Sequence, residues 1–248
     1  MRASDASIAA PPFPRKLPWC NIAMLKMHEQ RGKAVLVEFF DFCRVNNLRT
    51  LPYLKAWHER YAEAGLRVIS VHTGGFPPAR DEDNVRRAVE RLEIEWPVVI
   101  DTELEIWDLY GNEGWPARYL WTPDEHSLFS MHYGEGAYAE TEREIQELLG
   151  VSGPVVPPVR PEDAEDALIV PQTEDQPGPY SGPYEAGGVW AVVDGFGAIR
   201  VNGREFEITE PGAIELIHHD RHTRGELVFE LSEGVAVYAT CFTPGLAA

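Results

Sequence analysis

Residues 34–40, AVLVEFF, and residues 46–52, NNLRTLP, decide the fold of this chain. The first stretch has strand length and is rich in β-branched and aromatic side chains, which is typical of a buried strand. The second begins a helical stretch over roughly residues 45–64, ended by Gly65 as a C-cap. Its apolar side chains recur at steps of three and four residues and form one face: Leu48, Leu51, Leu54, Trp57 and Tyr61. Residues 66–72, LRVISVH, then predict a second buried strand.

Strands and helices continue to alternate up to about residue 150. After a Gly/Pro loop, Asp81 is positioned to cap a helix. We expect a strand at 97–100, a short helix at 102–110, two antiparallel strands at 117–121 and 128–133, and a last helix at 138–149. This order predicts a parallel sheet covered on both faces, with an antiparallel edge. Residues 1–33 are expected to form an irregular N-terminal extension.

The remainder of the chain has a different composition. Prolines recur among acidic residues from 151 to about 183, which predicts a linker. Residues 184–248 hold short β-prone runs separated by glycine turns, and these predict an all-β domain, a sandwich or small jelly roll. Its architecture resembles carbohydrate-binding modules, which stack sugars on exposed aromatic rings. The candidates are Trp190, Phe196, Phe206 and Tyr238, although strand alternation places several of them in the core.

Charge and cysteine usage narrow the function classes. With 40 acidic and 22 basic side chains the net charge is −18, which disfavours nucleic acid and anionic lipid as partners. No apolar run is long enough to cross a membrane, and residues 1–10 lack the pattern of a signal peptide. The cysteines Cys20, Cys43 and Cys241 are few, odd in number and far apart. They indicate a reduced, cytoplasmic location rather than a disulfide framework.

Several runs together carry a family resemblance. They span 35–40, 46–52, 71–73, 84–88, 96–101, 115–120 and 134–136, and continue at 185–187, 201–203, 211–213 and 241–246. On these residues the chain resembles the TlpA/redoxin branch of thioredoxin-like proteins, and more narrowly the soluble C-terminal region of DipZ-type cytochrome c biogenesis proteins. The resemblance covers about residues 30–248 and implies an α/β thioredoxin fold for residues 34–150.

One departure from that family bears on function. The family places a Cys-x-x-Cys pair just before the Leu-Arg-Thr-Leu-Pro run, and here those two positions hold Arg44 and Asn47. Disulfide exchange needs an attacking thiolate and a resolving thiol within reach. The sequence therefore favours a redox-inactive binding or scaffold protein. Its partner would be another protein or a small polar ligand, and a homo-oligomer is also compatible.

Cys43, one residue before the first family cysteine, offers an alternative. The helix N-terminus and the neighbouring Arg44 would lower the pKa of its thiol. A thiolate there would support single-cysteine thiol or peroxide chemistry. The competing interpretation is a small buried hydrophobe, the common role of an unmodified cysteine.

Other residues form a candidate cleft. By resemblance Pro116 should follow a cis peptide bond beside the altered motif. Trp115, Asn46 and Asn47 would then line a pocket for a polar ligand, with His72 as an acid–base group. Each also has a structural interpretation, since asparagine caps helices and a histidine at a strand end is often simply hydrogen-bonded. Glu135, between two glycines, suits close packing as well as function.

Metal and cofactor sites are not expected. His218, His219 and His222 form a metal-like cluster. They lack the glutamate that follows the first histidine of a zinc-protease helix, and they fall in a predicted loop. No phosphate-binding or dinucleotide glycine motif is present, so the sequence predicts neither metal nor cofactor.

Overall fold

The computed structural model describes residues 8–247, which form two compact units. The first unit holds the chain up to Asp41 together with Asn46–Val159. The second holds Phe42–Val45 and the chain from Arg160. Residues 151–159 of the expected linker thus lie with the first unit, where the Val156 N–H donates to Glu142 at 2.7 Å and the Val159 N–H donates to the Tyr53 hydroxyl at 2.7 Å.

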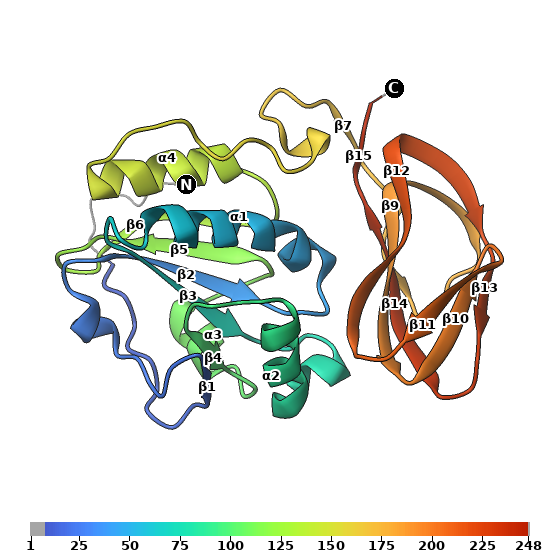
Figure 1. The fold of residues 1–248 in the computed structure, drawn as a ribbon, viewed down its shortest axis with the longest axis horizontal. Coiled ribbons are helices and arrows are strands. Elements are labelled where there is room, and N and C mark those ends of the chain that lie inside the picture. The colour runs from blue at the N-terminus through green and yellow to red at the C-terminus, as the bar shows by residue number, and fades with distance from the viewer. Residues whose placement is uncertain (1–7, 248) are drawn as a thin grey trace. The chain divides into compact units, whose positions relative to one another are not determined.

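The first unit is built on a six-stranded sheet in the order β1-β4-β3-β2-β5-β6 (Figure 1). Strands β2, β3 and β4 run parallel, and the remaining pairs are antiparallel. The parallel centre and antiparallel edge agree with the prediction. The strands are β1 (Trp19–Cys20), β2 (Ala34–Phe40), β3 (Leu66–His72), β4 (Val98–Ile100), β5 (Ala117–Trp121) and β6 (Leu128–Tyr133).

Helices cover both faces of this sheet. Helix α1 (Val45–Tyr61) and helix α4 (Tyr138–Leu149) lie side by side over one face, and α3 (Glu105–Tyr110) packs on the other through Ile106 (Figure 1). Helix α2 (Glu82–Arg91) begins as predicted, because the Asp81 carboxylate accepts the Asn84 N–H at 2.9 Å. Short 3₁₀ helices lie at η1 (Met27–Gln30) and η2 (Pro77–Arg80). Within residues 8–247, no helix is both long and apolar enough to cross a membrane.

The N-terminal segment is more ordered than the sequence suggested. Instead of irregular chain throughout, β1 pairs with β4, with Trp19 opposite Val99. Four apolar side chains of the segment are buried in the sheet core, where they fill the face covered by α3: Phe13, Trp19, Leu25 and Met27. Residues 1–7, including most of the segment tested for a signal peptide, lie outside the described residues.

The second unit is all-β. One antiparallel sheet has the order β12-β9-β14-β8, a second β11-β10-β13, and a third β15-β7. Its core contains Val189, Ile199, Leu216 and Phe242. The elements are η3 (Pro161–Asp163), β7 (Ile169–Val170), β8 (Gln176–Pro177), β9 (Gly182–Gly195), β10 (Gly197–Val201), β11 (Arg204–Ile208), β12 (Gly212–Leu227), β13 (Phe229–Leu231), β14 (Val235–Thr243) and β15 (Gly245–Leu246).

The histidine cluster is not in a loop, contrary to the expectation. His218 and His222 both lie within β12, which pairs with β9 on either side of them. The register of this pairing shifts between His218 and Thr223. Such an irregularity interrupts the alternation of inward and outward side chains. Because strands are predicted from alternating apolar and polar residues, this part of β12 does not have the sequence pattern of a strand.

Candidate functional site

Asn47 holds the loop that joins β2 to α1. Its amide nitrogen donates to the Phe39 carbonyl at 3.2 Å, and its amide oxygen accepts the Asp41 N–H at 3.2 Å. The side chain is buried. Both ends of the amide are therefore engaged in closing this loop.

We expect Asn47→Ala to lower the free energy of unfolding of the first unit by about 1–3 kcal/mol. The substitution leaves the Asp41 N–H and the Phe39 carbonyl buried without their partner. Urea titration followed by tryptophan fluorescence measures this effect, since six of the seven tryptophans lie in the first unit. The matched control is Asn46→Ala, at the exposed neighbouring position, where a change within about 0.5 kcal/mol is expected. Equal losses in both variants would contradict the assigned role.

Trp115 is hydrogen-bonded to the residue that follows β3. Its indole N–H donates to the Thr73 hydroxyl at 2.8 Å, and its ring lies 4.3 Å from that of Trp107. The Trp115–Pro116 peptide bond is cis. Nearby, the Asp41 carboxylate accepts the Gly75 N–H at 2.8 Å. Hydrogen bonds thus link the loops that follow β2 and β3 and the loop that precedes β5.

His72 lies in the core at the end of β3. It is fully buried, and the ring of Phe40 meets it edge-on at 4.9 Å. Burial lowers the pKa of the imidazole to about 3, because the charged form is poorly solvated there. The ring is therefore neutral at pH 7, where it cannot donate a proton as an imidazolium.

The three cysteines carry thiols rather than disulfides, and all are buried. Burial raises the pKa of the Cys20 thiol and of the Cys241 thiol, which disfavours their reactive thiolate forms. The Cys43 side chain has no exposed surface. Cys43 and the half-buried Arg44 belong to the second unit, whereas the exposed Asn46 belongs to the first.

Two of the predicted site residues make hydrogen bonds that hold loops of the first unit. Asn47 contacts the residues flanking its own loop, and Trp115 contacts Thr73. Two cavities of the first unit, of about 310 and 590 Å³, are lined by other residues.

Two buried ionisable residues, missed in the sequence, lie opposite each other in the centre of the sheet. Glu38 on β2 and Arg118 on β5 are register partners, and both are buried. Burial raises the pKa of Glu38 to about 8, against the smaller opposing effects of Arg118 and of the Ser70 hydroxyl, which donates to Glu38 at 3.3 Å. Burial likewise lowers the pKa of Arg118. The sequence signal was one charged residue within each of two apolar strands.

Glu135 has a structural partner. Its carboxylate pairs with the Arg49 guanidinium at 2.6 Å, with both side chains largely buried. The Tyr138 hydroxyl donates to the same carboxylate at 3.4 Å. This favours the packing interpretation of the Gly-Glu-Gly turn.

The histidines of β12 bond to separate partners. The His219 ring nitrogen bonds to the Tyr184 hydroxyl at 2.9 Å, and His222 bonds to the Glu185 carboxylate at 3.2 Å. Among residues 8–247, no group of three or more His, Cys, Asp or Glu side chains is placed to hold a metal ion.

The aromatic residues considered for sugar stacking differ in exposure. Phe196, at the turn between β9 and β10, is 77% exposed. Trp190, Phe206 and Tyr238 are half-buried. The Arg204 guanidinium covers the Phe206 ring at 4.9 Å. Phe196 is therefore the ring most available to a ligand.

The sheet order and helix placement define a thioredoxin-like fold of the redoxin type. A solved structure of a DsbE-type thiol:disulfide interchange protein from Chlorobium tepidum has the same fold. It superimposes with a TM-score of 0.53 at 20% identity and covers 60% of this chain and 100% of its own. No family model matches the sequence.

Two curated relatives extend this likeness to sequence. The chain is 31% identical over 152 residues to Protein DipZ of Mycobacterium tuberculosis, which is 61% of this chain and 22% of the relative. It is 28% identical over 126 residues to the thiol-disulfide oxidoreductase ResA of Halalkalibacterium halodurans, covering 50% of this chain and 67% of that protein. The chain thus spans about a fifth of the length of DipZ. The matched stretch is shorter than residues 30–248, over which the resemblance was expected.

Proposed function

We propose that this protein is a redox-inactive thioredoxin-fold protein that binds a partner instead of exchanging disulfides. Asn47 carries the proposal. By the family resemblance it stands where redox-active members have their second cysteine, and its amide closes the β2–α1 loop. With Arg44 at the first position, neither place required by a dithiol has sulfur.

The remaining thiols support the same proposal. Attack on a disulfide or a peroxide requires a thiolate that the substrate can reach. The Cys43 side chain is fully buried, and the buried Cys20 and Cys241 have raised thiol pKa values. Single-cysteine chemistry at Cys43 is the alternative, and it requires this side chain to become exposed.

Insulin reduction driven by dithiothreitol tests the proposal. The wild-type chain is expected to reduce insulin no faster than dithiothreitol alone. The positive control is Arg44→Cys/Asn47→Cys, which restores two thiols at the start of α1, where the helix N-terminus favours a thiolate. We expect this variant to exceed the dithiothreitol rate. Turnover by the wild-type chain would overturn the proposal.

Alkylation of the native protein distinguishes a redox-inactive binding protein from one that uses Cys43 in single-cysteine chemistry. We expect iodoacetamide to modify all three cysteines at least about 100-fold more slowly than in the denatured chain between pH 5 and 9, because each must first be exposed by opening of the structure. Mass spectrometry of the digested protein measures each site. Rapid labelling of Cys43, with peroxide consumption that Cys43→Ser abolishes, would instead establish single-cysteine chemistry.

We also propose a role for the second unit and a cellular location for the protein. The all-β unit is proposed to be a sandwich that contributes a binding surface for a protein or a small polar ligand, with the exposed Phe196 as its candidate contact. A cytoplasmic location is supported by three cysteines that remain thiols.

A further inference from the structure

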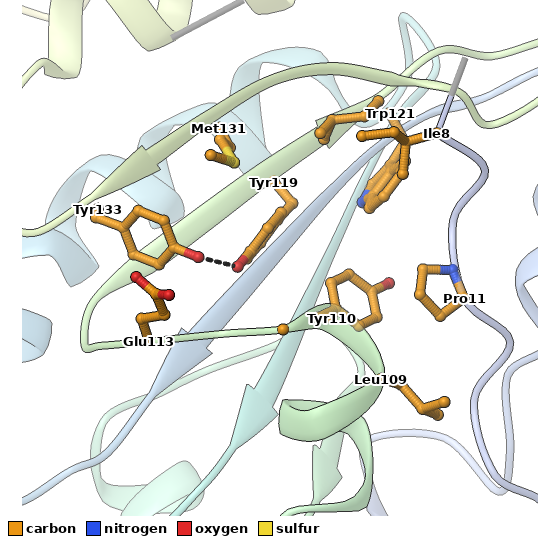
Figure 2. Close-up of a pocket in the computed structure, with 11 residues that line it drawn as sticks. Ile8, Pro11, Leu109, Tyr110, Glu113, Tyr119, Trp121, Met131 and Tyr133 are labelled. Atoms are coloured by element: carbon orange, nitrogen blue, oxygen red, sulfur yellow. Dashed lines mark hydrogen bonds between the residues drawn. The ribbon is translucent and has the colours of Figure 1, made fainter. Parts of the chain in front are cut away.

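The first unit contains a cavity of about 310 Å³ away from the residues discussed above. It lies where the end of α3 meets β5, β6 and the N-terminal residues Ile8 and Pro11 (Figure 2). Its volume falls near the lower end of the range of about 300–1,000 Å³ that is typical of small-molecule sites. A ligand of one or two rings suits this size.

Aromatic rings form the walls of this cavity. Tyr119 and Trp121, two residues apart on β5, present their rings on the same side of the sheet with an interplanar angle of 12°. Tyr110 meets both rings edge-on, at centroid distances of 5.3 and 5.7 Å. Because these rings pack against one another, a ligand would not need to order them, which favours binding.

Two residues of the wall each carry an unsatisfied hydrogen-bond donor. The Trp121 indole N–H and the Tyr110 hydroxyl are buried and have no hydrogen-bond partner among residues 8–247. The whole Trp121 side chain is 2% exposed. In Figure 2 the Tyr110 hydroxyl lies on the side of its ring that faces Pro11. An indole N–H can only donate, so the group that complements it is an acceptor.

The other hydroxyls of the cavity are already engaged. The Tyr133 and Tyr119 hydroxyls lie 2.7 Å apart, and the Tyr119 hydroxyl donates to the Asn112 side chain at 2.9 Å (Figure 2). The unmet hydrogen-bonding capacity is therefore concentrated at Trp121 and Tyr110.

Charge further restricts the occupant. Glu113, which carries a carboxylate, lines the same cavity (Figure 2). The chain as a whole carries a net charge of −18. Both features disfavour carboxylates and phosphates.

We infer that this cavity binds a small uncharged aromatic molecule that carries a hydrogen-bond acceptor such as a carbonyl oxygen. The aromatic walls take its ring, and the Trp121 N–H and the Tyr110 hydroxyl donate to its acceptor. This site is independent of whether the altered Cys-x-x-Cys region is redox-active.

Matched probes test the inference on the full chain. Dissociation constants are measured by NMR titration for 2-acetylnaphthalene, for 2-ethylnaphthalene, which lacks the acceptor, and for 2-naphthoate, which adds a negative charge. We expect the acetyl compound to bind about three- to tenfold more tightly than the ethyl compound, the factor that one neutral hydrogen bond supplies. Naphthoate should bind most weakly.

Variants then assign the donors. Trp121→Phe and Tyr110→Phe are each expected to reduce the preference for acetyl over ethyl, while both variants still bind the ethyl compound. The matched control is Trp19→Phe, because Trp19 is also buried with an unpartnered indole N–H but does not line this cavity. If Trp121→Phe fails to fold, Tyr110→Phe, which removes one oxygen atom, still decides the question.

Three results would overturn the inference. The first is a lack of saturable binding by 2-acetylnaphthalene. The second is an acetyl preference that is absent, or is unchanged in both Trp121→Phe and Tyr110→Phe. The third is tighter binding of the cation phenyltrimethylammonium than of 2-acetylnaphthalene, which would identify the rings and Glu113 as a cation site.

Discussion

Glu142→Ala is expected to destabilise the first unit by about 2–4 kcal/mol. Glu142 lies on α4, and its carboxylate is 1% exposed. It accepts four hydrogen bonds: from the Tyr61 hydroxyl at 2.7 Å, the Val156 N–H at 2.7 Å, the Trp57 indole at 3.1 Å and Arg60 at 3.2 Å. Truncation removes the acceptor for all four donors. The Trp57 indole, which is fully buried, is then left with an N–H group that water reaches poorly.

The matched control is Glu140→Ala on the same helix. Glu140 is exposed, so its removal is expected to cost under about 1 kcal/mol, mainly through the loss of a negative charge in the first turn of α4. Urea unfolding followed by tryptophan fluorescence compares the two variants. A loss at Glu142 no larger than that at Glu140 would show that the four bonds contribute little net stability.

The helices and strands of the first unit could be predicted where the spacing of apolar residues along the chain determines them. The strand at 34–40, the strand at 66–72 and the helix at 138–149 occur with the predicted bounds. Their apolar periodicities match the structures that they form, so local preference and burial agree. The start of α2 was equally predictable, because Asp81 supplies a cap that depends only on neighbours in the chain.

The missed elements depend on distant partners. Strand β1 has two residues and exists because Trp19 and Cys20 pair with Val99 and Val98 on β4. Nothing within residues 19–20 specifies that pairing. In β12, His218 and Thr223 pair with Gly188 and Ala186 of β9, and the residues between them fall in a shift of that register. Tertiary context overrides local propensity in both cases.

The candidate site illustrates the same limit. The sequence placed Asn47 correctly at the start of a helix, but its two hydrogen bonds depend on the path of the loop. Glu38 and Arg118 are 80 residues apart and become neighbours only through the β2–β5 register. The aromatic cavity combines α3, β5, β6 and the N-terminal segment, so no single motif indicated it.

Glu38→Gln is expected to abolish a large pH dependence in the stability of the first unit. The carboxyl has a pKa of about 8 in the folded chain against 4.5 as its ordinary value, because it is fully buried. Between these values the folded state holds a proton that the unfolded state has released. The Glu38 carboxyl therefore makes its full contribution to the free energy of unfolding below about pH 4.5. This contribution is lost as the pH rises towards 8, and the loss is about 3–5 kcal/mol in total.

Urea titrations at pH 5, 7 and 9 measure this difference. We expect Glu38→Gln and wild type to be similar in stability at pH 5, because a protonated carboxyl and an amide are both uncharged. The variant should be increasingly more stable at pH 7 and pH 9, since glutamine cannot ionise. Parallel pH profiles would instead mean that Glu38 is ionised in the folded chain at neutral pH. The Arg118 guanidinium on the adjacent strand would then outweigh the cost of burial.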